Sequence, residues 1–266
     1  MEQPTPIFTK ENLIERLREI KNRGWIPNAR PGNVGGIGNT LEDLLGIKEN
    51  NLPIPNAAEW ELKGQRIGTT SLITLKHIEP SPRALKFVPD ILLPKYGWRH
   101  QEAGIKYPEN EMSFRQTISS NTTSDRGFKV VINDKDQRIE ISFNASMVAL
   151  EHSMWLEAVE QRTGLGELNP QPYWGFSDLK SIIGTKLINC FYVQANSKKL
   201  EGIEYLQYEK LKILREFSFD NFLDALRKGD VLIDFDARTG HNHGTKIRVR
   251  QNKIPDLYHY SQDIIL

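Results

Sequence analysis

The chain has 266 residues, of which 38% are hydrophobic and 26% charged, and this composition predicts a globular protein with one large domain or two small ones. The single cysteine, Cys190, excludes a disulfide framework and a multi-cysteine zinc site. No apolar stretch approaches the roughly 18–20 residues of a membrane span, and the first residues lack a signal-peptide pattern, so we expect a cytoplasmic protein. A net charge of +1 does not by itself indicate a nucleic-acid binder.

The N-terminal part of the sequence predicts two helices separated by a glycine-rich loop. Residues 9–23 repeat apolar side chains at helical spacing, with Thr9 as a candidate N-cap and Gly24 as a left-handed stop. The loop leads into a short helix, at which Thr40 and Asp43 resemble a capping box.

The rest of the chain mixes helices and strands without strict alternation. We expect residues 79–112, which are rich in proline, to form a long irregular segment, and residues 186–195, the most apolar strand, to lie at the centre of a sheet. Strands are also expected at 58–63, 70–77, 114–118, 128–133, 138–143, 203–214, 231–235 and 246–250, and helices at 151–163, 177–184 and 220–228. This order predicts an α/β (α+β) fold with a mixed central β-sheet flanked by helices.

The sharpest chemical signal is the segment Glu59-Trp60-Glu61-Leu62-Lys63. Alternate residues of a strand share a face, so Glu61 and Lys63 point the same way, with Glu59 on that side, while Trp60 and Leu62 can face the core. Carboxylates hold Mg²⁺, and a lysine can position or help to deprotonate a water molecule, so the pattern suits metal-dependent phosphodiester hydrolysis. The alternative is a solvated charge pair on an exposed strand.

Glu42 adds an acidic group from the short helix that follows the glycine-rich loop. A metal site with two carboxylates often recruits a third from a neighbouring helix. The alternative is an exposed residue in a first helical turn, where the helix dipole favours negative charge.

A series of short motifs then becomes recognisable along the chain. They are Gly32–Leu45, Ile54–Lys63, Ser71–Leu75, Phe114–Ser119, Tyr173–Ser177, Ile233–Asp236 and His241–Arg248. Together, in this order and spacing, they resemble the MvaI/BcnI family of type II restriction endonucleases, in the MutH-like branch of the PD-(D/E)xK nucleases.

The resemblance implies a Mg²⁺-dependent endonuclease of double-stranded DNA with a restriction-endonuclease-like (MutH-like) fold. It further implies a monomer that acts on a short, G·C-rich pseudo-palindromic site, with a cognate DNA methyltransferase in the same restriction–modification system. Carried over by motif, Glu61 is expected to bind the metal, Lys63 to be the catalytic lysine and Glu42 to be the accessory carboxylate.

The resemblance also implies a single nuclease unit over residues 1–266, with two lobes around a DNA cleft. Residues 1–110 with 185–215 are expected to form the catalytic lobe, and residues 113–180 with 218–266 the DNA-recognition lobe.

One catalytic position departs from the family pattern. The family has an aspartate after the proline, and this chain has Asn56, whose carbonyl oxygen can bind a metal but carries no charge. Asn56 therefore stays a catalytic and metal-binding candidate beside Glu61, and Glu59 could supply the missing charge. Asn56 could instead be native with another metal arrangement, or mark an engineered inactive variant. The alternative function is a DNA-binding protein with a weakened or inactivated nuclease site.

Residues 237–253 form a basic stretch without an acidic residue. Its strand places Lys246, Arg248 and Arg250 on one face, where lysine and arginine can contact phosphates and an arginine can bind guanine. The resemblance places base-reading groups around Asp234, Asp236, His241, His243 and Arg248, and we add Arg238, Lys246 and Arg250 as DNA-binding candidates.

Three further readings stay open at this point. The basic stretch could be an ordinary charged strand, or His241 and His243 could bind zinc with Asp234 or Asp236. Aromatic and basic residues between 96 and 100 could contact DNA or pack as a surface loop. The glycine-rich loop could hold a nucleotide phosphate, although it lacks the Gly-Lys-Ser/Thr end of a P-loop.

Overall fold

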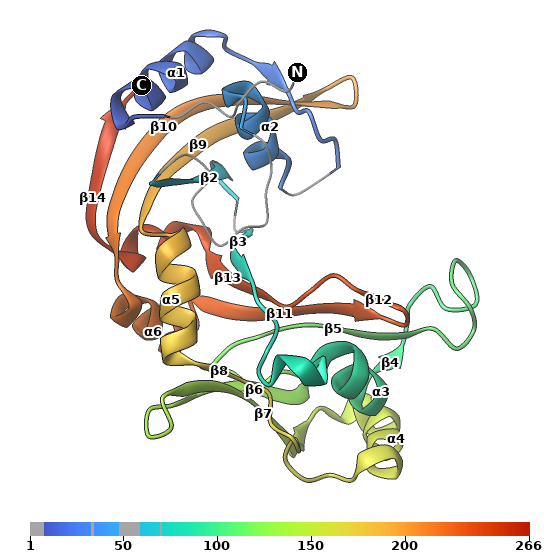
Figure 1. The fold of residues 1–266 in the computed structure, drawn as a ribbon. Coiled ribbons are helices and arrows are strands. Elements are labelled where there is room, and N and C mark those ends of the chain that lie inside the picture. The colour runs from blue at the N-terminus through green and yellow to red at the C-terminus, as the bar shows by residue number, and fades with distance from the viewer. Residues whose placement is uncertain (1–7, 33–34, 48–58, 70) are drawn as a thin grey trace. The chain divides into compact units, whose positions relative to one another are not determined.

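The computed structural model describes residues 8–32, 35–47, 59–69 and 71–266 (Figure 1). The chain divides into two compact units, and it passes between them four times. Unit 1 comprises Met1–Ser71, Ser181–Asn221 and Ile254–Leu266, and unit 2 comprises Leu72–Lys180 and Phe222–Lys253. No helix in the described part of the chain has the length and apolar character needed to cross a membrane.

Unit 1 is built on a mixed five-stranded sheet in the order β1-β10-β9-β2, with β14 also paired to β10. Only the edge strand β2 runs parallel to its neighbour, β9, and the other pairs are antiparallel. Its elements are α1 (Lys10–Asn22), β1 (Ile26–Pro27), α2 (Gly36–Leu45), β2 (Trp60–Arg66), β9 (Asn189–Leu200), β10 (Ile203–Phe217), a short helix at Pro255–Leu257 and β14 (Tyr258–Ile265).

Both N-terminal helices pack on one face of this sheet (Figure 1). The core between them includes Leu13, Leu17, Leu41, Trp60, Leu62, Phe191, Val193 and Tyr208. The alternation predicted for β2 is therefore observed, because its apolar side chains enter this core. Helix α1 also begins and ends as predicted: the Thr9 side chain accepts a hydrogen bond from Asn12 N at 3.3 Å, and Gly24 follows with φ +70°.

The capping box predicted at the start of the second helix is wrong. Helix α2 begins at Gly36, so Thr40 lies inside it. The buried Thr40 hydroxyl donates to Asn28 Oδ1 and accepts from Ala29 N, each at 3.0 Å. Hydrogen bonds to the segment after β1 therefore hold the Thr40 side chain. The sequence around Thr40 does not predict these long-range contacts.

Two glycines, one at the start of α2 and one in β2, lie at close approaches. A Cβ at Gly36 would lie 2.7 Å from Asn28 Oδ1, and one at Gly64 would lie 3.2 Å from Gly38 Cα. Helix α2 and strand β2 thus approach each other backbone to backbone, which only glycine permits.

Unit 2 contains two antiparallel sheets. One has six strands in the order β3-β13-β11-β5-β4, with β12 paired to β11, and the other has the order β6-β7-β8. Its strands are β3 (Leu72–His77), β4 (Trp98–Arg99), β5 (Met112–Ile118), β6 (Arg126–Asn133), β7 (Arg138–Val148), β8 (Tyr173–Gly175), β11 (Val231–Arg238), β12 (His241–Asn242) and β13 (Lys246–Arg250).

Several helices complete unit 2 and the passages between units. They are short helices at Arg83–Leu85, Leu150–His152 and Gln251–Lys253, a π-helix at Phe87–Leu92, α3 (Leu93–Tyr96), α4 (Ser153–Thr163), α5 (Phe176–Lys186) and α6 (Phe219–Arg227). The mixed α+β class is confirmed, and β9 lies inside its sheet as predicted, between β10 and β2.

The irregular segment predicted for residues 79–112 is only partly irregular. Residues 87–96 are helical, because Phe87, Leu92 and Tyr96 are buried at helical spacing and their packing outweighs Pro89 and Pro94. Pro94 lies near the start of α3, where its missing N–H costs little.

The units group two segments differently from the expected lobes. Strand β3 pairs with β13, so residues 72–110 belong to unit 2 rather than with the N-terminal segment. Strand β14 pairs with β10, so residues 254–266 belong to unit 1. Both pairings are long-range sheet contacts that the order of elements along the chain does not specify.

Candidate functional sites

Strand β2 places a buried ion pair on the face opposite its apolar side chains. Lys63 Nζ donates to Glu61 Oε1 at 2.8 Å, and the two side chains are 14% and 2% exposed. Water screens such a pair far less than an exposed one. The pair is therefore not the solvated surface pair that the sequence alone also allowed.

A second lysine, which sequence analysis missed, lies on the other oxygen of the same carboxylate. Lys186 Nζ is 3.4 Å from Glu61 Oε2. Lys186 is the last residue of α5, far from Glu61 in sequence, so no local pattern connects the two. Among the described residues, Glu61 Oε2 is buried and accepts no hydrogen bond.

Charge and burial together tune the groups around this carboxylate. Burial alone would lower the pKa of Lys63, but the charge and hydrogen bond of Glu61, with smaller effects from Cys190 and Glu42, raise it on balance. Cys190 lies opposite Glu61 in the β2–β9 register, and burial raises the pKa of its thiol to about 12. Because the reactive form of cysteine is the thiolate, Cys190 is not a nucleophile at neutral pH.

Glu42 lies near this pair, as the effect of its charge on the pKa of Lys63 shows. It stands one helical turn after Gly38, the residue that touches Gly64 of β2, so it lies on the face of α2 that turns toward that strand. The structure thus brings Glu42, Glu61 and Lys63 into one neighbourhood.

The other two metal candidates are not placed with this group. Glu59 is exposed in the turn before β2, which begins at Trp60, so strand alternation does not extend to it. Asn56 lies outside the described residues.

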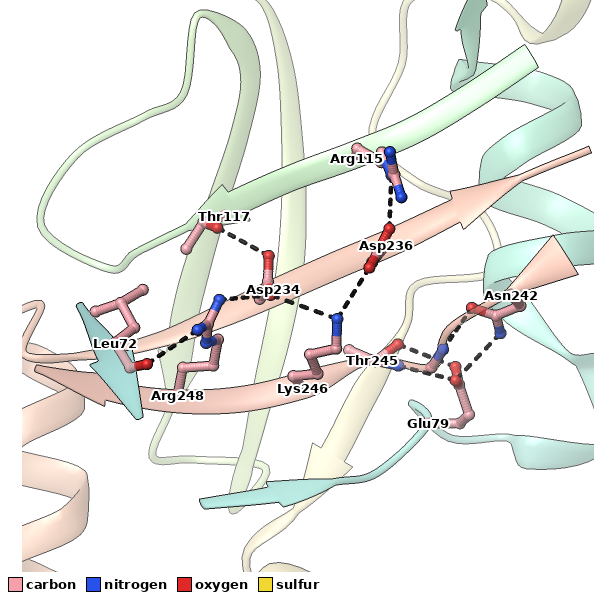
Figure 2. Close-up of polar contacts among 11 residues, drawn as sticks. Leu72, Glu79, Arg115, Thr117, Asp234, Asp236, Asn242, Thr245, Lys246 and Arg248 are labelled. Atoms are coloured by element: carbon pink, nitrogen blue, oxygen red, sulfur yellow. Dashed lines mark hydrogen bonds and ion pairs between the residues drawn. The ribbon is translucent and has the colours of Figure 1, made fainter. Parts of the chain in front are cut away.

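Unit 2 carries a row of paired charges across three neighbouring strands, which Figure 2 shows. Asp234 of β11 accepts hydrogen bonds from Thr117 Oγ1 at 2.9 Å and Arg248 Nη1 at 3.1 Å. Asp236, two residues further on the same face, accepts from Arg115 Nε at 2.6 Å and Lys246 Nζ at 3.0 Å. Thr117 and Arg115 of β5 lie directly opposite Asp234 and Asp236. The partners on β13 are diagonal, because Asp234 lies opposite Lys246 and Leu232 lies opposite Arg248.

Mutual pairing holds these charged side chains in fixed orientations. Arg248 Nη2 also donates to the Leu72 carbonyl at 2.9 Å, while its buried Nε has no hydrogen-bond partner among the described residues. Burial would raise the pKa of Asp236, but the hydrogen bonds and charges of Lys246 and Arg115 lower it on balance. The row is held together by its own hydrogen bonds, and Arg248 Nε is unused among the described residues.

A turn beside this row presents two histidines. The rings of His241 and His243 meet edge to face with centroids 4.2 Å apart. Glu79 fastens the turn, since its carboxylate accepts from Asn242 Nδ2 at 3.2 Å and from Thr245 N and Oγ1, each at 3.0 Å (Figure 2). Partial burial, with the nearby charges of His241, Arg115 and Lys246, lowers the pKa of His243 despite the opposing charge of Asp236.

The remaining basic candidates differ in how much they are already engaged. Arg238 donates to Glu111 Oε1 at 2.9 Å and lies over the Tyr107 ring, with its guanidinium carbon 4.5 Å from the centroid. Arg250 is 52% exposed and its Nε lies 3.9 Å from Asp230. Arg250 is therefore the basic side chain of β13 that solvent reaches most freely.

Sequence analysis did not include Arg115, Thr117 or Glu79 among the site residues. The motif around Phe114 was part of the family resemblance, but only the β5–β11 register shows that Arg115 and Thr117 face the aspartates. The proposed role of the aromatic segment is not supported by its placement, because Tyr96 and His100 are buried.

The zinc alternative finds no support among the described residues. The group of three potential ligands within 4.8 Å of one another is Asp125, Glu151 and His152, and it includes neither His241 nor His243. His152 Nε2 already pairs with Asp125 Oδ2 at 3.0 Å, and both acidic residues are exposed.

Comparisons with known proteins bear on the fold and the family of this chain. A model of the MvaI/BcnI restriction endonuclease family matches residues 14–258, and no curated protein matches the chain. Among solved structures, the chain resembles one described as restriction endonuclease MvaI in complex with a cognate DNA substrate, with a TM-score of 0.75, 21% identity and coverage of 97% of this chain and 99% of that one.

The chain is also similar to MvaI in the absence of DNA, with a TM-score of 0.52, 22% identity and coverage of 100% of both chains. These likenesses show the fold, and the family model spans nearly the whole chain. The chain therefore belongs to the MvaI/BcnI restriction endonuclease family and is a type II site-specific deoxyribonuclease.

Proposed function

We propose that the chain hydrolyses phosphodiester bonds of double-stranded DNA in a Mg²⁺-dependent reaction centred on Glu61 and Lys63. The observation that carries this proposal is the buried pair itself. A carboxylate and a lysine are held 2.8 Å apart, with the second carboxylate oxygen free of hydrogen bonds among the described residues.

The donors around this pair fit a hard divalent cation. Mg²⁺ prefers carboxylate oxygens and retains several waters, so it needs few protein ligands. Glu61 Oε2 offers one oxygen, Glu42 lies close by, and Asn56 is proposed to add its carbonyl oxygen, with Glu59 as a further carboxylate. Bound there, the cation would stabilise negative charge on the phosphate and lower the pKa of a water ligand.

Lys63 has the protonation state that a positioning role requires. Its pKa is raised, so at neutral pH it carries a positive charge and can orient a water molecule or a phosphate oxygen by hydrogen bonding. Glu61 fixes the ammonium group from one side and leaves its other N–H groups available.

We further propose that the charged row of unit 2 reads the DNA sequence. Paired acids and bases suit G·C recognition, since an arginine can bind guanine O6 and N7, and an aspartate can accept from cytosine N4. Arg248 and the two histidines are assigned to bases with Asp234 and Asp236, while Lys246, Arg250 and Arg238 are assigned to phosphates or positioning. The target is then a short, G·C-rich pseudo-palindrome.

The proposed division of labour follows the two units. Unit 1 carries the hydrolytic cluster and unit 2 the recognition row. We propose a cytoplasmic enzyme that acts as a monomer, together with a DNA methyltransferase that protects the same site.

Incubation of the protein with a mapped plasmid and Mg²⁺ tests the proposal. Discrete fragments that disappear when a chelator is added are the expected result. Retained DNA binding without any cleavage would instead support the alternative, a DNA-binding protein with an inactivated nuclease site.

A further inference from the structure

Lys186 gives the buried Glu61 carboxylate a second positive neighbour. Its Nζ lies 3.4 Å from Oε2, while Lys63 Nζ donates to Oε1 at 2.8 Å. The side chains of Lys186 and Glu61 are 11% and 2% exposed, so solvent screens their attraction weakly. Each oxygen of this carboxylate therefore has its own cation.

The two contacts differ in kind. Lys63 makes a hydrogen bond, whereas Glu61 Oε2 accepts none among the described residues although Lys186 is close. An unused acceptor that is buried costs free energy, so structures seldom retain one without a function. Lys186 thus compensates the charge of this oxygen while leaving its lone pairs open to another ligand.

The fold holds Lys186 where its charge is favourable. It is the last residue of α5, and a cation near a helix C-terminus interacts favourably with the helix dipole. The buried neighbours Ile183 and Leu187, joined by a 2.8 Å hydrogen bond from Leu187 N to Ile183 O, anchor this end of the helix. The packing of the C-terminal end of α5 therefore determines where the Lys186 ammonium group lies.

We propose that Lys186 is a positioning residue that serves as the resident counter-charge of Glu61 and sets how tightly the site binds a divalent cation. The inference rests on the proposed role of Glu61 as a metal ligand. Two lysines already balance the charge of the carboxylate that a cation at Oε2 would bind. Lys186, the lysine beside Oε2, also repels that cation. Lys186 therefore holds Glu61 in place without metal and weakens metal binding.

The charge balance of the described cluster supports this role. Glu61 and Glu42 are the carboxylates whose charges raise the pKa of Lys63, and Lys63 and Lys186 oppose them, so the positive and negative charges are equal in number. A site close to neutral attracts a dication less than an acidic one does.

Mn²⁺ binding to the full chain, without DNA, tests this proposal. The free-ion signal of Mn²⁺ in electron paramagnetic resonance gives its affinity for the parent and for Lys186→Met, which keeps an unbranched side chain one atom shorter and removes its charge. We expect Lys186→Met to bind Mn²⁺ about tenfold more tightly. Lys186→Arg, which keeps the charge, and Lys180→Met, at an exposed position of the same helix, should stay within about twofold of the parent.

Thermal unfolding with and without Mn²⁺ gives a second readout, because a merely structural lysine would cost the same stability in both conditions. In chelator, Lys186→Met should melt below the parent, because a buried carboxylate has lost a partner. Saturating Mn²⁺ should remove most of that difference. Equal losses with and without Mn²⁺, or an unchanged or weaker Mn²⁺ affinity, would overturn the proposal.

Two further variants separate the possible failures. If Lys186→Met does not fold, Lys186→Gln removes the charge while keeping a polar end, and the same affinity increase is required of it. Glu61→Gln should abolish Mn²⁺ binding at this site. If Glu61→Gln binds Mn²⁺ like the parent, the proposed metal role fails; if it loses binding while Lys186→Met changes nothing, only the role of Lys186 fails.

Discussion

The two candidate sites both pair carboxylates with basic side chains, but they differ in burial and in how fully the carboxylate oxygens are used. In unit 1 one carboxylate, Glu61, is shared by two lysines and is almost fully buried. In unit 2 two aspartates share four neighbouring donors and are partly accessible. The first arrangement leaves one carboxylate oxygen without a hydrogen bond among the described residues, and the second pairs both aspartates with three basic side chains and Thr117.

This difference matches the two tasks that a restriction endonuclease combines. Hydrolysis needs a small group of charges whose electrostatic interactions are not screened by water. Sequence readout needs many donors and acceptors held at set spacings on an accessible surface. The comparison therefore predicts that substitutions in the cluster of unit 1 change cleavage more than binding, whereas substitutions in the row of unit 2 change binding first.

The largest effect is expected from the lysine of the buried pair. Lys63→Ala should lower the cleavage rate by about 10²–10⁴-fold, the range usual for a lost positioning or acid–base group. DNA affinity should remain close to that of the parent, because phosphate contacts elsewhere dominate binding. Cleavage of a plasmid and a binding titration on the same preparation measure both. Parent-like cutting by this variant would remove Lys63 from the active site.

Position 56 is expected to have the next largest effect. Asn56→Asp should bind Mg²⁺ more tightly and cleave faster, because a carboxylate returns an anionic oxygen to the proposed site. If Glu59 already supplies that charge, the parent should cut and Glu59→Gln should silence it. Cleavage rate as a function of Mg²⁺ concentration for the parent and both variants separates these cases. No change in either variant would place position 56 outside the site.

A smaller, sequence-dependent effect is expected from the row of unit 2. Arg248→Ala should lose about 1–3 kcal/mol of discrimination between specific and random DNA, the usual value of a bidentate guanine contact. Arg250→Ala, at the more exposed position of β13, serves as the matched control. It should weaken binding to all DNA alike and flatten its salt dependence. Equal loss on specific and random DNA for Arg248→Ala would make Arg248 a phosphate contact.

The sequence predicted what lies close together along the chain. Glu61 and Lys63 stand two residues apart, so strand alternation alone placed them on one side of β2. Asp234 and Asp236 were expected from the family resemblance, and the predicted strand ended at residue 235, whereas β11 continues to Arg238 and includes both. Helix α1 and its cap were also correct because its signals are local.

Contacts between distant segments could not be predicted in the same way. Lys186 reaches Glu61 from α5, and Arg115 reaches Asp236 through strand register. The Thr40 hydroxyl donates a hydrogen bond to Asn28 instead of capping the helix, as the local pattern had suggested. In each case tertiary packing decides between local alternatives, and a single sequence contains no direct record of that packing.

The smallest expected effect concerns acid stability, and it follows from the row of unit 2. Lys246 and Arg115 hold the folded pKa of Asp236 below its usual value, although burial opposes them. The unfolded chain therefore binds a proton at Asp236 at a higher pH than the folded protein does. The stabilisation by this group is present above its unfolded pKa, near 4, and is lost as the pH falls through the folded pKa.

Asp236→Asn should therefore flatten the fall in unfolding free energy between neutral pH and about pH 3, since the amide does not titrate. Asp263→Asn is the control, because Asp263 pairs with Lys212 at 2.7 Å but is 78% exposed, and exposed pairs contribute little. Urea unfolding at several pH values measures the slopes. An unchanged slope in Asp236→Asn would show that Lys246 and Arg115 do not lower the folded pKa of Asp236.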